Sequence, residues 1–313
     1  MRFHAIMFVR DEDDIIAESL EYNSRWCDHI YVFDTGSTDN TWEIVLESAR
    51  KLKQVVPVRR EVVWWHDGLR AMVFEQFRSQ SDDGDWWVRL DADEFYHVSP
   101  REFVARLRPY ESSVYHAYYN FKLTVEEAAR YEAPGFLVQD RARSIADRRP
   151  YYVPQFDYSE PRFFRYRRAM KWNPPAFAPF NAGFVARRRI PIRHYPHRDP
   201  QQMERRFRLR HKMLQEMGKM DPNYASHWQS DWQSELVPAN SPGVLRWDPA
   251  QGDLLPCQDS SHLPGRWRRS LQFAIHFATL PALDRLRPPY PRDFQPTRLP
   301  SDVQASLMID GSI

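Results

Sequence analysis

The sequence of 313 residues has only two cysteines, only ten glycines and no long uninterrupted apolar run. Cys27 and Cys257 lie far apart, and neither belongs to a C-x-x-C pair of the kind that binds zinc or carries redox chemistry. The scarcity of glycine excludes a fibrous or low-complexity chain. No window approaches the roughly 18 apolar residues of a membrane span, and the N-terminus has no leader pattern. We therefore expect a soluble cytoplasmic protein, with peripheral contact to the inner face of the membrane left open.

What the sequence does contain is enough apolar material for a core and an uneven distribution of charge. Hydrophobic residues make up 42% of the chain and aromatic residues 14%. Residues 1–100 hold 20 acidic and 11 basic side chains, a net charge of −9, which leaves +11 for the remainder of a chain with net charge +2. An acidic segment suits a bound cation and a basic one suits phosphate or an anionic surface, although solvated surface positions explain most of these charges.

The first hundred residues alternate apolar runs with segments of helical periodicity. This alternation predicts parallel strands with helical crossovers, and therefore an α/β fold with a mostly parallel sheet flanked by helices. The expected strands cover residues 3–9, 30–33, 55–58 and 86–90, and the expected helices follow residue 14, cover 42–52 and cover 69–77.

The pattern changes after residue 100. Ser99 and Pro100 predict the start of a helix, residues 114–121 and 162–166 read as strands, and the segment 124–150 reads as an insertion or flexible loop with one short helix at 125–131. Further helices are expected over 203–217, with an arginine-rich face, and over 271–286, before a proline-rich tail. We divide the chain into a first part (1–122), a second part (123–218) and a partly irregular C-terminal helical extension (219–313).

Asp91-Ala92-Asp93-Glu94 directly follows an apolar strand. Side chains two positions apart in an extended chain point the same way, so Asp91 and Asp93 can present oxygen atoms to one hard cation such as Mg²⁺ or Mn²⁺. A D-x-D sequence alone is weak evidence, because acidic turns are common at strand ends.

A second acidic turn, Asp34-Thr35-Gly36-Ser37-Thr38-Asp39, also leaves a strand. Its later residues can cap the next helix through side-chain oxygens. Capping does not account for Asp34, whose carboxylate can accept hydrogen bonds from a nucleobase or ribose. In parallel sheets ligands bind beyond the carboxyl ends of the strands, where both turns are expected.

Together these segments resemble family 2 glycosyltransferases. The resemblance is carried by Phe8-Val9-Arg10-Asp11-Glu12, by the run from Asp34 to Thr41 and by Leu90 to Phe95, in the order and spacing of that family. The stretch from His194 to Met203 is similar to a C-terminal segment of a bacterial subgroup. The likeness covers the first 100 residues well and residues 160–215 loosely. It implies a GT-A-type, Rossmann-like fold and transfer of a sugar from a nucleoside diphosphate. It also implies that residues 1–122 are the nucleotide-sugar-binding half, that 123–218 are the acceptor and catalytic half, and that the extension 219–313 lies on the acceptor side.

The resemblance also implies roles for individual residues. Asp93 corresponds to the direct metal ligand, and His194 to the histidine that completes the metal or diphosphate site, although His197 competes for that role. Arg198, four residues further on, is suited to pair with phosphate oxygens. The nucleotide would be contacted by residues in five other positions: Val9, Asp11, Asp34, Arg70 and Asp91.

An inverting transfer needs a base for the proton of the acceptor hydroxyl. Many members of the family supply this base from a Glu-Asp dipeptide in the second half, and this sequence has no such dipeptide there. Asp157 and Glu160, just before the strand at 162–166, are the candidates, and a plain surface carboxylate is the competing interpretation.

The expected donor is a nucleoside-diphosphate sugar, UDP-linked in the first instance, bound with Mn²⁺ or Mg²⁺, and the expected acceptor is a glycan or lipid-linked glycan, as in polysaccharide biosynthesis. The basic face of the 203–217 helix could meet an anionic membrane surface. A nucleotidyltransferase also uses paired carboxylates, but it would need a glycine- and lysine-rich loop where residues 10–14 are acidic. A nucleic-acid-binding module built on the basic region 141–212 is a third possibility, although the acidic first half argues against a nucleic-acid partner.

Overall fold

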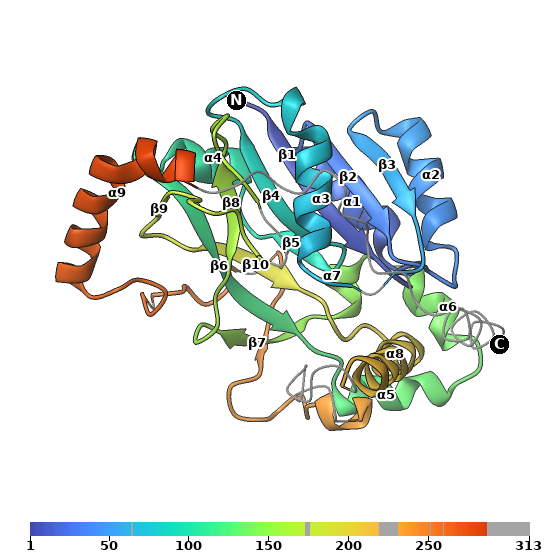
Figure 1. The fold of residues 1–313 in the computed structure, drawn as a ribbon. Coiled ribbons are helices and arrows are strands. Elements are labelled where there is room, and N and C mark those ends of the chain that lie inside the picture. Colours follow the sequence, from blue (N-terminus) through green and yellow to red (C-terminus); the bar gives the residue numbers. More distant parts are fainter. Residues whose placement is uncertain (64, 173–175, 219–230, 251, 259, 287–313) are drawn as a thin grey trace.

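The computed structural model describes all residues except 64, 173–175, 219–230, 251, 259 and 287–313. Its centre is a sheet whose described strands number eleven (Figure 1). The main path through the sheet runs β11-β7-β6-β8-β4-β1-β2-β3, with β5, β9 and β10 attached beside it.

The N-terminal part of the sheet is parallel, as the alternating sequence pattern predicts. Its strands, in chain order, are β1 (Phe3–Val9), β2 (His29–Asp34), β3 (Val55–Arg60) and β4 (Trp86–Asp91). β1 pairs in parallel with both β2 and β4, and β2 pairs in parallel with β3. Every residue of β1 is buried, which is typical of a strand covered on both faces.

Two apolar clusters cover the two faces of this parallel part. Side chains of α1 (Ile16–Ser24) and α2 (Thr41–Lys51) join one cluster, and side chains of α3 (Gly68–Phe77) join the other. Alternate residues of β1 follow the same division: Met7 belongs to the first cluster and Ile6 to the second. The layers are therefore helix, sheet and helix, the architecture expected of this half.

The second part of the sheet is mixed rather than parallel. Its strands are β5 (Glu94–Tyr96), β6 (Glu111–Phe121), β7 (Tyr151–Gln155), β8 (Pro161–Arg165), β9 (Phe184–Val185), β10 (Ile190–His194) and β11 (Leu245–Arg246). β8 lies antiparallel between β4 and β6 and so reverses the strand direction. Strands from both sides of the expected boundary at residue 122 belong to this one sheet.

The segment 124–150, expected to be largely loop, is instead mostly helical. It contains α5 (Val125–Ala129), η2 (Arg130–Glu132), α6 (Phe136–Arg141) and α7 (Ile145–Arg148). The physical reason is local capping: Thr124 and Glu127 form a reciprocal capping box at the start of α5, and the Ser144 side chain accepts a hydrogen bond from the Asp147 N–H.

The sequence predicts the three α-helices that remain, but not the two short 3-10 helices. The α-helices are α4 (Pro100–Ala105), α8 (Pro200–Gly218) and α9 (Arg266–Leu286), and the 3-10 helices are η1 (Arg78–Gln80) and η4 (Trp232–Glu235). α8 lies beside the carboxyl ends of the first strands, whereas α9 lies at the far side of the molecule (Figure 1). Within the described part of the chain, no helix is both long enough and apolar enough to cross a membrane.

Candidate active site

The two acidic turns lie at the same edge of the sheet, one on each side of β1. Val9 pairs with Asp34 on β2, and Phe8 pairs with Asp91 on β4. Since the three strands are parallel and end together, the sheet brings the Asp34 turn and the Asp91–Asp93 turn to the two flanks of one strand end.

The Asp34 carboxylate organises the first turn. Its Oδ1 accepts hydrogen bonds from the backbone N–H groups of Gly36 (2.8 Å) and Ser37 (2.7 Å), while the buried Oδ2 has no hydrogen-bond partner among the described residues. Burial raises the pKa of Asp34. Gly36 has φ +106°, and a Cβ there would come within 2.9 Å of Val62, so this turn requires glycine. Asp34 therefore has one oxygen left for an additional donor.

Asp11 and Val9 support the turn from the end of β1. Asp11 has a positive φ of 54°, and its Oδ1 accepts a hydrogen bond from the Thr38 N–H at 2.6 Å. The Val9 side chain is buried, and its carbonyl accepts a hydrogen bond from the Thr35 N–H at 3.0 Å. The turn is thus fixed by contacts from β1 before any ligand is considered.

Asp91 lies between two buried arginines. Arg70 Nη2 donates to Asp91 Oδ1 at 2.7 Å, and Arg162 Nη1 donates to Asp91 Oδ2 at 3.2 Å. Burial acts to raise the pKa of Asp91, but the charges of Arg70 and Arg162 outweigh it and the pKa is lowered. Arg162 also pairs with Glu94, which accepts a hydrogen bond from the Tyr118 hydroxyl, and burial raises the pKa of Glu94 to about 8.

Asp93 faces a different set of partners. Its Oδ2 lies 2.9 Å from Arg206 Nη1 on α8 and 3.5 Å from His194 Nε2 at the end of β10. Burial opposes ionisation, but the neighbouring His194 and Arg206 hold the pKa of Asp93 well below its usual range. The Asp91 and Asp93 carboxylates therefore stay charged, each among basic side chains from different parts of the chain.

His194 is oriented towards Asp93 by Asn120. Nδ1 of His194 lies 2.7 Å from Asn120 Oδ1, an acceptor, so Nδ1 carries a proton and the opposite ring nitrogen, Nε2, faces Asp93. The imidazole stacks on Tyr118 with ring centroids 4.7 Å apart. His197, the competing histidine, is buried near Phe207 instead and has Nε2 3.9 Å from Glu235.

Arg198 is completely buried, and its guanidinium is surrounded by carboxylates. Its guanidinium donates to Asp14 through Nε (2.8 Å) and to Glu12, with Asp93 Oδ2 4.0 Å away. In this structure Arg198 has no exposed surface with which to meet a phosphate. Its position makes it the link between the end of β1 and the Asp93 turn.

The two candidate bases differ in their surroundings. Glu160 immediately precedes β8, with a side chain 26% exposed and Oε2 3.2 Å from Arg89, and it accepts a hydrogen bond from the Tyr158 hydroxyl. Burial acts to raise the pKa of Glu160, but Arg89 and Arg162 outweigh it and the pKa is lowered. Asp157 is exposed on the preceding loop.

Several site residues were not anticipated from the sequence. Asn120, Arg162 and Arg206 are the clearest: each contacts one of the predicted residues, and each comes from a segment interpreted only as strand or as basic helix. Arg162 is the one with a usable signal, since an arginine next to Phe163 and Phe164 in a short strand with four successive buried residues needs a buried partner. Arg206 could not be separated from the other arginines of its helix without knowing which face of α8 meets Asp93.

The donor set around Asp93 fits a divalent cation in part. Across the described residues, no cluster of three or more His, Cys, Asp or Glu side chains is arranged to hold a metal ion. Asp93 and His194 offer two suitable donors, an oxygen and a nitrogen that Mn²⁺ accepts. Mg²⁺ and Mn²⁺ in nucleotide sites commonly take only one or two protein ligands and complete their shell with phosphate oxygens and water.

Comparison with known proteins identifies a family for this arrangement. A sequence profile described as glycosyl transferase family 2 matches residues 5–190, which include β1 through the start of β10 and both acidic turns. A search of the curated proteins found no match.

Three solved structures are similar over part of the chain. One is the mannosyltransferase PcManGT from Pyrobaculum calidifontis in complex with GDP-Man and Mn²⁺, with 16% identity, TM-score 0.28, and 39% of this chain and 35% of that one covered. TarS 1-349 from S. aureus has 17% identity, TM-score 0.26 and coverages of 40% and 36%. Glucosyl-3-phosphoglycerate synthase from Mycobacterium tuberculosis has 19% identity, TM-score 0.22 and coverages of 48% and 54%. The chain thus spans between about a third and just over half of these proteins.

The profile match covers more than half of the 313 residues and contains the three N-terminal motifs of the resemblance, whereas the stretch from His194 to Met203 lies beyond the matched residues. The GT-A-type α/β fold expected from the sequence is therefore confirmed. The chain belongs to glycosyl transferase family 2.

Proposed function

We propose that this enzyme transfers a sugar from a nucleoside diphosphate to a hydroxyl of a glycan or lipid-linked glycan, with inversion and with Mn²⁺ or Mg²⁺. The observation that carries the proposal is the pairing of Asp93 with His194. Their Oδ2 and Nε2 atoms lie 3.5 Å apart at the sheet edge where the two acidic turns meet. The match to the glycosyl transferase family 2 profile also disfavours the two alternatives drawn from the sequence, a nucleotidyltransferase and a nucleic-acid-binding module.

In this proposal the Asp34 turn binds the nucleoside. The unpartnered Oδ2 of Asp34 accepts a hydrogen bond from the base or ribose, after a small opening of the turn that buries it. Val9 and Asp11 shape the same end of β1, and Arg70 approaches the nucleotide from α3 while holding Asp91. Uracil, with an N–H donor beside two carbonyls, suits a carboxylate acceptor, which supports a UDP-linked donor.

Asp93 and His194 are the residues that would hold the metal ion. When bound, Mn²⁺ or Mg²⁺ neutralises charge on the diphosphate as it leaves the sugar. Asn120 keeps Nε2 of His194 directed at the site, and Arg206 is a cation near enough to pair with the same diphosphate. Arg198, predicted to contact phosphate, acts here by fixing Glu12, Asp14 and Asp93.

Glu160 is the preferred base. It is partly exposed and is connected to the nucleotide side of the site through Arg89, which also lies 3.6 Å from Asp67, the partner of Arg70. A carboxylate that stays ionised at neutral pH can accept the proton of an acceptor hydroxyl as the new glycosidic bond forms. Asp157 remains the second candidate.

Calorimetric titration of UDP and GDP, with Mn²⁺ and with EDTA, tests the metal and nucleotide parts of the proposal. UDP binding is expected to weaken about tenfold or more on removal of the metal, and equally in Asp93→Asn, whose binding should no longer respond to Mn²⁺. Asn120→Leu should show an intermediate loss because it leaves His194 in place but unoriented.

Glu21→Gln, an exposed change on α1, is the matched control and should bind UDP normally. If the affinities for UDP and GDP change neither when EDTA removes the metal nor in Asp93→Asn, the metal-dependent proposal is overturned. Screening nucleotide sugars for slow metal-dependent hydrolysis then identifies the donor.

A further inference from the structure

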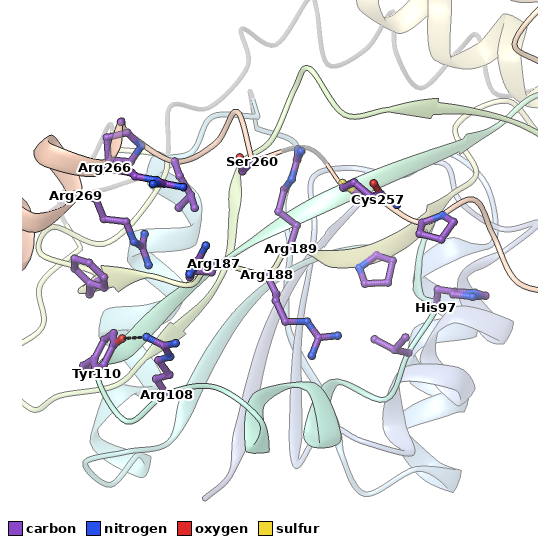
Figure 2. A pocket seen from close by; sticks show the side chains of 18 of the residues that line it. His97, Arg108, Tyr110, Arg187, Arg188, Arg189, Cys257, Ser260, Arg266 and Arg269 are labelled. Carbon is purple, nitrogen blue, oxygen red and sulfur yellow. Dashed lines mark hydrogen bonds between the residues drawn. The ribbon is translucent and has the colours of Figure 1, made fainter.

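A large basic cavity lies at the edge of the sheet opposite the candidate active site. It has a volume of about 1410 Å³. Its walls come from the residues before β6, from the residues between β9 and β10, and from α9 and the segment leading into it (Figure 2). Since β6 and β10 are parallel, their starting ends line this cavity, whereas their far ends carry Asn120 and His194.

Arginine dominates this cavity, which we call the arginine cavity. The arginines that line it are Arg108, Arg187, Arg188, Arg189, Arg266 and Arg269 (Figure 2). Asp253 supplies the only carboxylate among the described lining residues. Such a concentration of guanidinium groups creates a positive potential that attracts phosphate or carboxylate groups.

Three of these arginines are available for an anion. Within the described residues, Arg187 and Arg266 form no ion pair, and Arg188 has only a cation–π contact, 5.3 Å from the Phe103 ring. Arg269 differs from them, because it donates to the Val185 carbonyl at 3.0 Å and lies 3.7 Å from Glu111. It therefore anchors α9, whereas the guanidinium groups of Arg187, Arg188 and Arg266 have no carboxylate partner among the described residues.

The helix beside the arginine cavity carries an exposed apolar stripe. Trp267, Leu271 and Ile275, which we call the α9 stripe, are 68%, 51% and 48% exposed. Their spacing of four residues places them on one face of the helix. Phe273 points elsewhere and packs edge-on against Tyr110, which fixes α9 to the cavity wall. Apolar side chains of this size, exposed beside a basic cluster, indicate a binding surface.

We propose that the α9 stripe and the arginine cavity form a docking surface for a membrane that contains acidic phospholipids. Each half of the surface meets one property of such a membrane: the stripe enters the boundary of headgroups and acyl chains, and the arginines meet the headgroup phosphates. A soluble phosphate compound would account for the arginines but leave the stripe exposed. A second copy related by a two-fold axis would bring the arginines of both copies together, which is repulsive.

This surface differs from the one suggested by the sequence, the basic face of the 203–217 helix. In the structure Arg205 pairs with Asp13 at 3.2 Å and with Asp39 at 3.3 Å, and Arg206 pairs with Asp93. These two arginines of α8 are therefore paired with the acidic first half of the chain, and Arg208 pairs with Glu204 of its own helix. The excess positive charge of the second half reaches solvent at the arginine cavity instead.

Vesicle co-sedimentation with the full chain tests the proposal. The protein should bind vesicles of phosphatidylcholine with phosphatidylglycerol and not vesicles of phosphatidylcholine alone. Trp267→Gln with Leu271→Gln should lower the partition coefficient about tenfold or more, because the apolar insertion is lost. Arg187→Gln with Arg188→Gln should lower it by a similar factor and remove most of its dependence on salt.

Matched controls change the same residue types elsewhere. Val138→Gln removes a 74% exposed apolar side chain from α6, and Arg208→Gln removes a charge from α8; both should bind like the unaltered protein, and circular dichroism checks that every variant is folded. The proposal is overturned if acidic vesicles do not bind, or if the α9 stripe variant binds them normally. Thermal stabilisation by inorganic pyrophosphate without vesicle binding would assign the cavity to a soluble anion, and a dimer lost on changing the stripe would assign it to a second copy.

Discussion

At the scale of single residues, the environment of each carboxylate decides what it can do. Glu160 is held ionised by Arg89 and Arg162 against the effect of burial, so its pKa lies below its ordinary value. A base with a lowered pKa remains in the required charged form throughout the neutral range. The activity should accordingly fall only at acid pH, below the range in which an ordinary glutamate titrates.

Replacing Glu160 by Gln removes the proton acceptor while keeping its shape. The kcat for transfer should fall about 100-fold or more, with the KM for the donor little changed, because the nucleotide is bound by other residues. Steady-state kinetics on the donor identified by hydrolysis measures both constants. Asp157→Asn is the comparison: if it loses kcat and Glu160→Gln does not, the roles of the two residues are exchanged.

A second effect at this scale concerns a histidine far from the chemistry. His4 is the second residue of β1, fully buried and stacked on Trp87 with ring centroids 5.0 Å apart. Burial lowers its pKa to about 4, and the neighbouring His29 adds to the shift. The unfolded chain takes up this proton near pH 6.5, whereas the folded protein does so only near pH 4. Stability is therefore lost as pH falls from about 6.5 towards 4.

His4→Phe keeps the stacking and removes this titration. Between pH 7.5 and pH 5, the free energy of unfolding of the variant should fall by about 2 kcal/mol less than that of the unaltered protein. The variant starts from a different value at pH 7.5, since it loses the contact of Nδ1 with the Tyr31 hydroxyl at 3.1 Å. Urea unfolding at both pH values gives the comparison, and an equal fall in both proteins would refute the assignment.

At the scale of elements, β8 is the strand that determines how the two parts of the sheet meet. It lies antiparallel between β4 and β6, and it places Arg162 where it reaches Asp91, Glu94 and Tyr118. Removing one partner from a buried charge cluster is costly because the remaining carboxylates lose their compensation. The sheet junction and the acidic turn of the site are therefore stabilised by the same side chain.

Arg162→Met should lower the free energy of unfolding by about 3–5 kcal/mol. Glu94→Gln added to it should change the loss little, since burial already raises the pKa of Glu94 to about 8 and its carboxyl is neutral once Arg162 is gone, which leaves Asp91 as the carboxylate that loses compensation. Arg165→Met, on the same strand but with its guanidinium on the exposed Pro109 carbonyl at 2.8 Å, is the control and should cost under about 1 kcal/mol. Chemical unfolding of the three variants gives the values, and equal losses in Arg162→Met and Arg165→Met would contradict this role.

The elements that the sequence predicts are those with a local physical signal. β1 is a continuous apolar run and α2 has apolar residues at helical spacing, so both follow from residue order alone. β5 and β9 are three and two residues long, too short for any period to show, and they exist because neighbouring strands pair with them. The same limit applies to the site, where Asp93 stands out in the sequence but its partners do not. Its contacts to His194, which Asn120 orients, and to Arg206 arise only because the fold brings β10 and α8 to it.

At the scale of the whole molecule, the opposite charges of the two parts of the chain meet at the carboxyl ends of the first strands. Asp14, in the turn after β1, is buried between Arg198 and Arg148, which lie at 2.8 Å and 3.5 Å. Arg148 also reaches Asp199 at 3.3 Å, just before α8. Three distant segments are thus joined through ion pairs that have no exposed surface, and this junction supports the Asp93 side of the site.

Asp14→Asn tests how much of the molecule depends on that junction. Asparagine keeps the size of the side chain but leaves two buried guanidinium groups short of a negative charge, so we expect a loss of about 3–5 kcal/mol in the free energy of unfolding. UDP affinity in Mn²⁺ should weaken as well, because Arg198 also lies 4.0 Å from Asp93 and a displaced Arg198 no longer fixes that turn. Glu21→Gln breaks an exposed pair with Arg25, 3.1 Å apart, and should change stability by less than about 1 kcal/mol. If both variants lose the same stability, the buried pairs contribute no more than surface pairs, and the charge asymmetry of the chain has no part in joining its segments.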